Sequence, residues 1–201
     1  LDVEDGVYFD EDNVDLTEKT QWVDADDALL AMDLNGDGVI NDGSELFGSS
    51  TVLADGSLAK TGFEALAQYD SNGDMVIDEQ DEKFSEMLLW QDMNTDGISQ
   101  ANELYTLEQV GVESISLNSS VSSGVNSADV IMADGTVTRM GEFAFASELY
   151  NTKGENMEIS EEIQGLPNVQ AMGRLKSLHT LMQLDETGTL KEYVTAFTQA
   201  A

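Results

Sequence analysis

Residues 92–103 read Asp-Met-Asn-Thr-Asp-Gly-Ile-Ser-Gln-Ala-Asn-Glu, and this stretch decides the fold that we expect. It matches the twelve-position calcium loop, with oxygen-bearing side chains at positions 1, 3, 5 and 9, glycine at position 6 and glutamate at position 12. Calcium takes about six to eight oxygen ligands, and Gly97 permits the sharp turn between them. The expected ligands are Asp92, Asn94, Asp96, the carbonyl of Ile98, Gln100 and Glu103.

A second stretch of this kind occupies residues 70–81. It departs from the pattern at Met75, where glycine is usual, so Met75 must adopt a positive φ at a cost of about 1 kcal/mol. Asp81 replaces the last glutamate and, being shorter, reaches an ion with one oxygen or through water. We therefore expect weakened binding. The expected ligands are Asp70, Asn72, Asp74, the carbonyl of Val76, Asp78 and Asp81.

Two further stretches fit less well. Residues 33–45 have the same opening, but the glutamate falls one place late, so this loop is either thirteen residues long or closed by Asp42. Residues 10–18 are the poorest candidate, because Val14 replaces a ligand and Asp15 replaces the turn glycine. The expected ligands in these two stretches are Asp33, Asn35, Asp37, the carbonyl of Val39, Asp42 or Glu45, and, in the poorest candidate, Asp10 and Asp12.

Clusters of Asp, Asn and Gly also occur in surface turns of proteins that hold no metal. Three loops with one shared spacing of oxygen-bearing side chains favour metal, and calcium is favoured over magnesium, which prefers water-rich octahedral sites. The formal charge of −32 agrees, because such self-repulsion opposes compaction unless cations are held in the fold. The sequence therefore predicts two or more Ca²⁺ ions as folding ligands.

Composition excludes several classes of function. The absence of cysteine excludes disulfides, thiolate zinc sites and cysteine nucleophiles. His179 is the sole histidine, so Ser/His/Asp catalysis cannot be argued, and packing is a better explanation for it than metal binding. The eight Lys and Arg residues are scattered, so we expect no nucleic-acid partner. No apolar run approaches the roughly 20 residues of a membrane span.

Hydrophobic spacing predicts short helices beside the acidic loops, over residues 22–32, 62–69, 82–90 and 100–110, the last ending at Gly111. Farther along, residues 130–132 and 136–140 flank Asp134-Gly135 and predict a hairpin. Helix is expected again from Ser160, with a break near Gly188.

The predicted fold class is therefore α+β, with EF-hand-like calcium loops and short helices, a small β-hairpin or sheet region, and a C-terminal helical hairpin. We expect a calcium-binding region over 1–111, a hairpin region over 112–158 and C-terminal helices over 159–201, together forming one compact module.

Several motifs resemble one known family. Residues 21–27 read Gln-Trp-Val-Asp-Ala-Asp-Asp, residues 45–48 read Glu-Leu-Phe-Gly, and residues 89–92 read Leu-Trp-Gln-Asp. These, with the loops and the hairpin, resemble the calcium-dependent self-processing modules of RTX proteins and related modules of large RTX adhesins. The resemblance implies export of the unfolded chain by a type I system, folding in extracellular calcium, and self-cleavage at an upstream Asp-Pro bond.

The chain departs from that family in two respects. It lacks the Leu-Asp-Leu-Asp-Gly-Asp-Gly-like stretch that follows the cut in that family, and it contains no Asp-Pro dipeptide, since its sole proline, Pro167, follows Leu166. We therefore nominate no catalytic residue. The first expectation is a calcium-folded structural module of a large secreted or cell-surface RTX adhesin or toxin, monomeric and in contact with neighbouring domains of a larger chain. The alternative is a self-processing module that cuts a bond outside this sequence.

Overall fold

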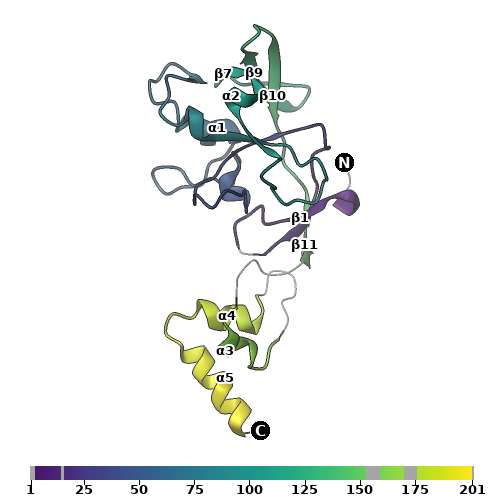
Figure 1. The fold of residues 1–201 in the computed structure, drawn as a ribbon, viewed down its shortest axis with the longest axis vertical. Helices are drawn as coiled ribbons and strands as arrows, with labels where there is room; N and C mark the ends of the chain where they lie inside the picture. The colour runs from purple at the N-terminus through teal and green to yellow at the C-terminus, as the bar shows by residue number, and fades with distance from the viewer. Residues whose placement is uncertain (1–2, 15, 153–158, 170–175, 201) are drawn as a thin grey trace.

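The computed structural model describes residues 3–14, 16–152, 159–169 and 176–200, and Figure 1 shows their arrangement. Within these residues, eleven β-strands form three antiparallel sheets. One sheet has the order β1-β2-β11, with β1 at Val7–Phe9, β2 at Glu18–Thr20 and β11 at Ser147–Thr152. Another has the order β3-β5-β6, with β3 at Leu29–Met32, β5 at Met87–Trp90 and β6 at Leu104–Thr106.

The largest sheet has the order β10-β9-β7-β4, and β8 also pairs with β9. Its strands are β4 (Val76–Asp78), β7 (Val112–Ser116), β8 (Ser120–Ser122), β9 (Val125–Met132) and β10 (Val137–Glu142). Because β4 pairs with β7, this sheet joins segments on both sides of residue 111. The division of the chain at that residue stays a prediction.

The helices of the described residues are short. The α-helices are α1 (Gly62–Ala67), α2 (Leu107–Val110), α3 (Glu161–Gln164), α4 (Leu178–Leu184) and α5 (Thr189–Ala200). Three 3₁₀ turns accompany them: η1 (Val3–Asp5), η2 (Gly43–Glu45) and η3 (Phe84–Glu86).

The predicted α+β class, with EF-hand-like loops and short helices, is wrong, because the molecule is mostly β. Leu29–Met32 and Met87–Trp90, expected in helices, pair with each other as β3 and β5. Residues 104–106, expected within the helix over residues 100–110, form β6 instead. The reason is that a four-residue apolar run fits a buried strand as well as a helical turn, and its partner strand decides between them.

Three local predictions in the first 150 residues are confirmed. The helix expected over residues 62–69 is α1, whose N-cap Thr61 accepts a hydrogen bond from the Glu64 amide. Gly111 ends α2 in the left-handed conformation, with φ +77°. The hairpin is formed by β9 and β10, and Gly135 has φ +82° in its turn.

The predicted C-terminal helical hairpin is also wrong: three short helices occupy the described part of this region. They form a separate group in Figure 1, from which α5 extends outward. The Ser160 amide donates to Gln183 Oε1 over 3.1 Å, and Lys191 pairs with Glu162 over 3.0 Å. The expected break does occur, since Gly188 lies between α4 and α5 with φ +69°.

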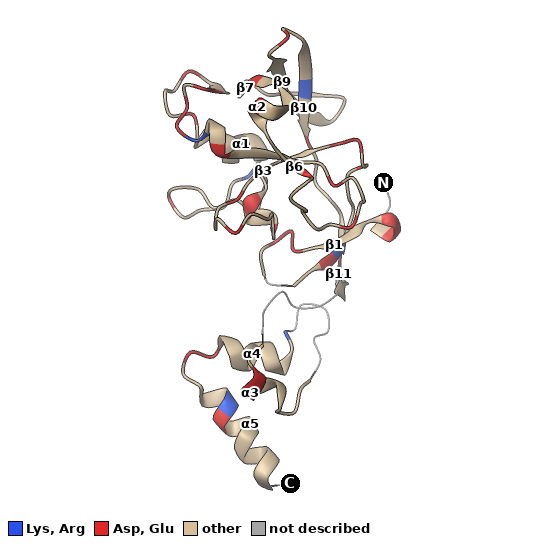
Figure 2. Cartoon of the chain, in the orientation of Figure 1, with Lys and Arg blue, Asp and Glu red and all other residues tan. Residues whose placement is uncertain are grey.

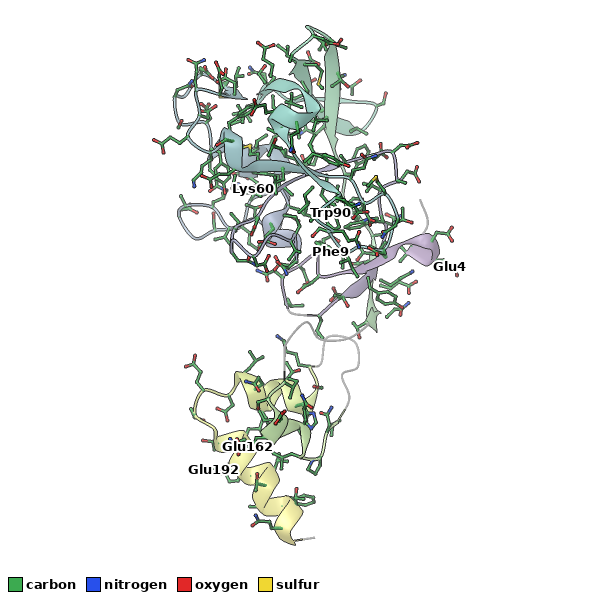
Figure 3. The ribbon with its side chains drawn as sticks, in the orientation of Figure 1. Glu4, Phe9, Lys60, Trp90, Glu162 and Glu192 are labelled. Atoms are coloured by element: carbon green, nitrogen blue, oxygen red, sulfur yellow. The ribbon has the colours of Figure 1, made fainter. Side chains whose placement is uncertain are left out.

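Two hydrophobic clusters hold the sheets together. The aliphatic core contains Met32, Leu66, Ile77, Met87, Leu107, Val112, Ile115, Leu117 and Val130. The aromatic core contains Val7, Phe9, Trp22, Ala31, Ile40 and Trp90. Figure 3 places Phe9 and Trp90 next to each other, and their ring centroids are 5.6 Å apart. The acidic loops are attached to one or the other of these two cores.

Many acidic residues lie on the loops between the strands, as Figure 2 shows. Among the described residues, every helix is too short or too polar to cross a bilayer.

Candidate calcium-binding loops

The three predicted loops lie next to strands, rather than between pairs of helices. Loop 92–103 connects β5 to β6, and loop 33–45 follows β3 directly. Loop 70–81 follows α1 and contains β4. Strands therefore anchor both ends of loop 92–103, the start of loop 33–45 and the middle of loop 70–81. The backbone of each loop folds around its own acidic side chains.

Asp92, the first residue of loop 92–103, is fully buried. Its Oδ1 accepts a hydrogen bond from the Asp96 amide over 3.2 Å, and its Oδ2 accepts one from the Gly97 amide over 2.8 Å. The Trp22 indole also donates to Oδ2, over 2.7 Å. The carboxylate therefore organises the first half of the loop and links it to the aromatic core.

The first aspartates of the other two loops also accept hydrogen bonds from amides of their own loops, and the sixth residue is a donor in all three. Asp33 accepts from the Gly36 and Gly38 amides (2.7 and 2.8 Å), and Asp70 accepts from the Gly73 and Met75 amides (2.7 and 2.9 Å). The sixth residue has a positive φ in each loop: +87° at Gly38, +67° at Met75 and +75° at Gly97. The predicted left-handed conformation of Met75 is thus confirmed.

The last carboxylate of each loop accepts hydrogen bonds from the second and ninth residues. In loop 92–103, Glu103 accepts from the amides of Met93 (3.1 Å) and Gln100 (3.3 Å). In loop 70–81, Asp81 accepts from the amides of Ser71 (2.7 Å) and Asp78 (3.0 Å). Asp81 therefore accepts hydrogen bonds from the same two loop positions as Glu103 does in loop 92–103.

Loop 33–45 closes on Glu45. This buried carboxylate accepts from the amides of Leu34 (3.0 Å) and Asn41 (2.8 Å), the donors that Glu103 and Asp81 use in their loops. Asp42 instead caps η2 and accepts from the Ser44 amide over 2.8 Å. Of the two alternatives left open by the sequence, the hydrogen bonds match the thirteen-residue loop, and the choice of ion ligand stays a prediction.

The pKa values of two closing carboxylates are shifted in opposite directions. Burial raises the pKa of Glu45, and the hydrogen bonds from Asn41 and Leu34 offset this only in part. Burial also acts to raise the pKa of Asp81, but hydrogen bonds from Asp78 and Ser71 outweigh it and hold the pKa below its usual value. The two loops therefore differ in how readily a proton competes for the closing carboxylate.

The side chains at positions 3, 5 and 9 converge in loop 92–103. The amide of Asn94 lies 3.0 Å from Asp96 Oδ2 and 3.3 Å from Gln100 Oε1, and Gln100 Nε2 lies 3.0 Å from Asp96 Oδ2. Each of these side chains carries an oxygen that suits a hard cation. Their approach in the folded chain is what a shared ion requires.

The same convergence is partial in the other loops. In loop 70–81, Asn72 Nδ2 lies 3.0 Å from Asp74 Oδ2, whereas Asp78 Oδ1 turns to the Gln80 amide at 2.8 Å. In loop 33–45, Asn35 Nδ2 lies 3.1 Å from Asn41 Oδ1. The seventh residues donate their amides to the fifth side chains, in the pairs Val39–Asp37 (3.0 Å), Val76–Asp74 (2.9 Å) and Ile98–Asp96 (2.9 Å).

The chemistry of the donor set fits calcium. The side chains that converge are carboxylates and amides, without imidazole or thiolate, and oxygen donors of this kind suit Ca²⁺ or Mg²⁺ rather than zinc. Within the described chain, the ion pairs made by Lys and Arg leave the carboxylates of these three loops untouched.

Stretch 10–18 also gathers carboxylates. Asp10, Asp12 and Glu18 each offer an oxygen, and these oxygens lie within 4.8 Å of one another. Asp10 and Glu18 are buried, and Asp10 Oδ1 accepts a hydrogen bond from the Val14 amide over 3.0 Å. Asp15, expected to occupy the turn position, lies outside the described residues. Glu18, the ninth residue counted from Asp10, was not among the ligands expected from the sequence.

Two further residues of interest were missed because their contacts span distant parts of the chain. Trp22 reaches Asp92 across 70 positions, and Ser99 reaches Ile40 across 59. No local pattern could have indicated either contact.

Comparison with known proteins adds a family match and a relative. The family model described as SPM domain matches residues 1–147. The iron-regulated protein FrpA of Neisseria meningitidis serogroup C is 42% identical over 207 residues, an alignment that covers 98% of this chain and 19% of that protein. The chain thus spans about a fifth of the length of this curated relative.

Proposed function

The chain belongs to the SPM domain family, and from this premise we propose that it is a calcium-binding, calcium-folded structural module of a larger secreted protein of the RTX type. Its role in that protein, an adhesin or a toxin, is to form a rigid support between neighbouring domains once calcium is available. The chain matches about a fifth of the length of its relative, and this supports the proposal that it is one module of a larger protein.

The observation that carries the proposal is the convergence of oxygen-bearing side chains in loop 92–103. Asn94, Asp96 and Gln100 lie within 3.3 Å of one another in a loop whose closing Glu103 is buried. Rotation of the two amides would turn their oxygens towards the same point as the Asp96 carboxylate. Loops 33–45 and 70–81 repeat the hydrogen-bond arrangement, so we propose at least one Ca²⁺ in each of the three loops, with the ligands expected from the sequence and Glu45 closing its loop.

Electrostatics connects binding with folding. The chain carries a net charge of −32, and folding brings its carboxylates together inside the loops. Without cations this repulsion opposes the compact state, whereas a cation that binds only the folded state stabilises it by RT ln(1 + [L]/Kd). Each site contributes about 2.7 kcal/mol when calcium exceeds its Kd a hundredfold. A chain of this kind stays open at low calcium and folds outside the cell.

The test is circular dichroism with thermal melting in excess chelator, followed by a calcium titration into the millimolar range and a parallel magnesium titration. A cooperative melt that needs calcium is expected, and Asp96→Ala should lower the melting temperature and remove one ion in equilibrium dialysis. Asp134→Ala removes the same charge from the β9–β10 turn and should leave the ion count unchanged. Equal folding and stability in chelator and in calcium would overturn the proposal.

A self-processing activity is the second candidate. The motifs at residues 45–48 and 89–92, which resemble RTX self-processing modules, favour it. The test is a fusion in which a reporter domain precedes the chain through a linker that contains an Asp-Pro bond, with an Asn-Pro linker as the control. Calcium-dependent release of the reporter from the Asp-Pro fusion alone would establish this activity, and an intact fusion in calcium would leave the structural role.

A further inference from the structure

Loops 33–45 and 92–103 are in direct contact through Ser99. The Ile40 amide donates to Ser99 Oγ over 2.6 Å, and Ser99 Oγ lies 3.2 Å from the Ile40 carbonyl oxygen, to which it donates. Both residues are buried, with 3% and 2% of their surface exposed. Counted from the first aspartate, each is the eighth residue of its loop. The two loops therefore meet at equivalent positions, although Ser99 and Ile40 are 59 positions apart.

Loop 70–81 does not share this contact. Its eighth residue, Ile77, lies in β4 and pairs with Ile115 of β7. Ile77 belongs to the aliphatic core, whereas Ile40 belongs to the aromatic core. Loop 92–103 reaches the aromatic core as well, through the hydrogen bond from Trp22 to Asp92. The loops thus divide into a pair on the aromatic core and a single loop on the aliphatic core.

The contact lies next to the expected ligands. Ser99 follows Ile98, whose carbonyl is an expected ligand, and Ile40 follows Val39, which has the same role in its own loop. An ion in loop 92–103 would fix the backbone around Ser99, and the short hydrogen bond would then restrict Ile40. The second ion would bind a loop that is already partly ordered, and ordering of this kind gives positive cooperativity without a large change in structure.

We propose that loops 33–45 and 92–103 bind calcium as a cooperative pair, that Ser99 is the positioning residue that couples them, and that loop 70–81 binds outside this pair. This inference rests on the proposed calcium binding and adds which sites communicate. It assigns a role to a buried serine that supplies no ligand.

The experiment follows one backbone amide in each loop by ¹H–¹⁵N NMR while calcium is withdrawn stepwise from the loaded chain. The Gly38, Gly97 and Gly73 amides are suitable reporters, because each donates to the first aspartate of its loop. In Asp37→Asn, the calcium concentration at half-loading should rise for Gly97 by about fivefold more than for Gly73. Coupling through folding of the whole chain would instead raise the calcium concentration at half-loading equally for Gly97 and Gly73.

The reverse variant, Asp74→Asn, impairs loop 70–81. It should change the calcium concentrations at half-loading reported by Gly38 and Gly97 by equal amounts. Ser99→Ala, combined with Asp37→Asn, should abolish the difference between Gly97 and Gly73. Ser57→Ala serves as the control, because Ser57 lies in an exposed turn outside the loops. In Ser99→Ala alone, the Gly38 and Gly97 amides should both still respond to calcium. The calcium concentrations at half-loading that they report should then differ from each other.

Two outcomes would overturn the inference, and they differ in what they say of the proposed function. Equal movement of Gly97 and Gly73 in Asp37→Asn, with every reporter still responding to calcium, removes the coupling and leaves calcium binding intact. A chain whose glycine amides do not respond to calcium removes both.

Discussion

The indole nitrogen of Trp22 donates a hydrogen bond to Asp92 Oδ2 over 2.7 Å, and both side chains are buried. Trp22 packs against Phe9 and Trp90, with ring centroids 5.2 Å away in each case. The first aspartate of loop 92–103 is therefore held by the aromatic core as well as by its own loop. A buried carboxylate that loses a donor loses stabilisation of its charge, so, with the proposed calcium binding, the indole would position Asp92 for the ion.

Trp22→Phe tests this role. Loss of a hydrogen bond to a charged group should cost about 1.5–3 kcal/mol of unfolding free energy and should raise the calcium concentration that half-loads loop 92–103. Trp90→Phe is the matched control, because within the described residues no acceptor lies within hydrogen-bond distance of Trp90 Nε1. Chemical denaturation in saturating calcium and the Gly97 amide signal measure the two effects. Equal calcium responses in the two variants would contradict a positioning role for the indole.

If Glu45 closes a thirteen-residue loop, substitution of Glu45 and substitution of Asp42 should affect calcium loading differently. Glu45→Gln should raise the calcium concentration needed to load loop 33–45 by about tenfold or more, since a cation loses a charged ligand there. Asp42→Asn should leave calcium loading near the wild-type level, because Asp42 caps η2 and asparagine caps a helix about as well as aspartate. Calorimetric titration of the two variants, with the Gly38 amide as reporter, measures this difference. The reverse order would mean that Asp42 closes the loop.

The hydrogen bonds of Asp185 predict that the stability of the C-terminal helices depends on pH, independently of calcium. The Thr187 hydroxyl donates to it over 2.6 Å and the Leu190 amide over 2.7 Å, and these bonds hold the pKa of Asp185 below its ordinary value. A folded-state pKa below the unfolded one stabilises the fold above about pH 4, and this contribution is lost as the pH falls through the folded-state pKa.

Protection of the α5 amides from hydrogen exchange should therefore decrease as the pH falls below about 4, after correction for the intrinsic exchange rate. Asp185→Asn should weaken protection already at neutral pH and remove the pH dependence. Glu186→Gln, which removes a charge from the same turn and leaves these hydrogen bonds in place, should behave as wild type. A pH dependence that persists in Asp185→Asn would assign it to another group.

Short-range structure could be predicted because its causes lie close together in the sequence. The hydrogen bonds within loop 92–103 join residues no more than 10 positions apart, so the spacing of Asp92, Asp96 and Glu103 indicates them. The turn at Asp134-Gly135 follows from glycine at a positive φ between two apolar segments. These features need no knowledge of the remaining fold.

The mostly β architecture could not be predicted for the opposite reason. Leu29–Met32 becomes a strand because Met87–Trp90 lies beside it, and neither segment carries a period long enough to separate strand from helix. The contact between loops 33–45 and 92–103 is made by Ser99, whose partner Ile40 lies 59 positions away in the sequence. Long-range partners therefore decided both the fold class and the organisation of the site.

Met75 provides a final test of how loop geometry limits stability. It has φ +67° at a position where the other two loops have glycine, and 46% of its surface is exposed, so little packing is lost on truncation. The left-handed conformation costs a non-glycine residue about 1–2 kcal/mol, while glycine costs about 0.5–1 kcal/mol in backbone entropy. Met75→Gly should therefore raise the unfolding free energy by about 0.5–1 kcal/mol and tighten calcium binding in loop 70–81.

Met93→Gly is the matched control, since Met93 is 44% exposed and has no positive φ. Glycine there adds backbone entropy to the unfolded chain and relieves no strain, so the variant should be less stable than wild type. Denaturant unfolding of both variants at saturating calcium, with the Gly73 amide as the calcium reporter, measures the two signs. If Met75→Gly is destabilised as much as Met93→Gly, the positive φ of Met75 carries no strain, and another cause must be sought for any weak binding in loop 70–81.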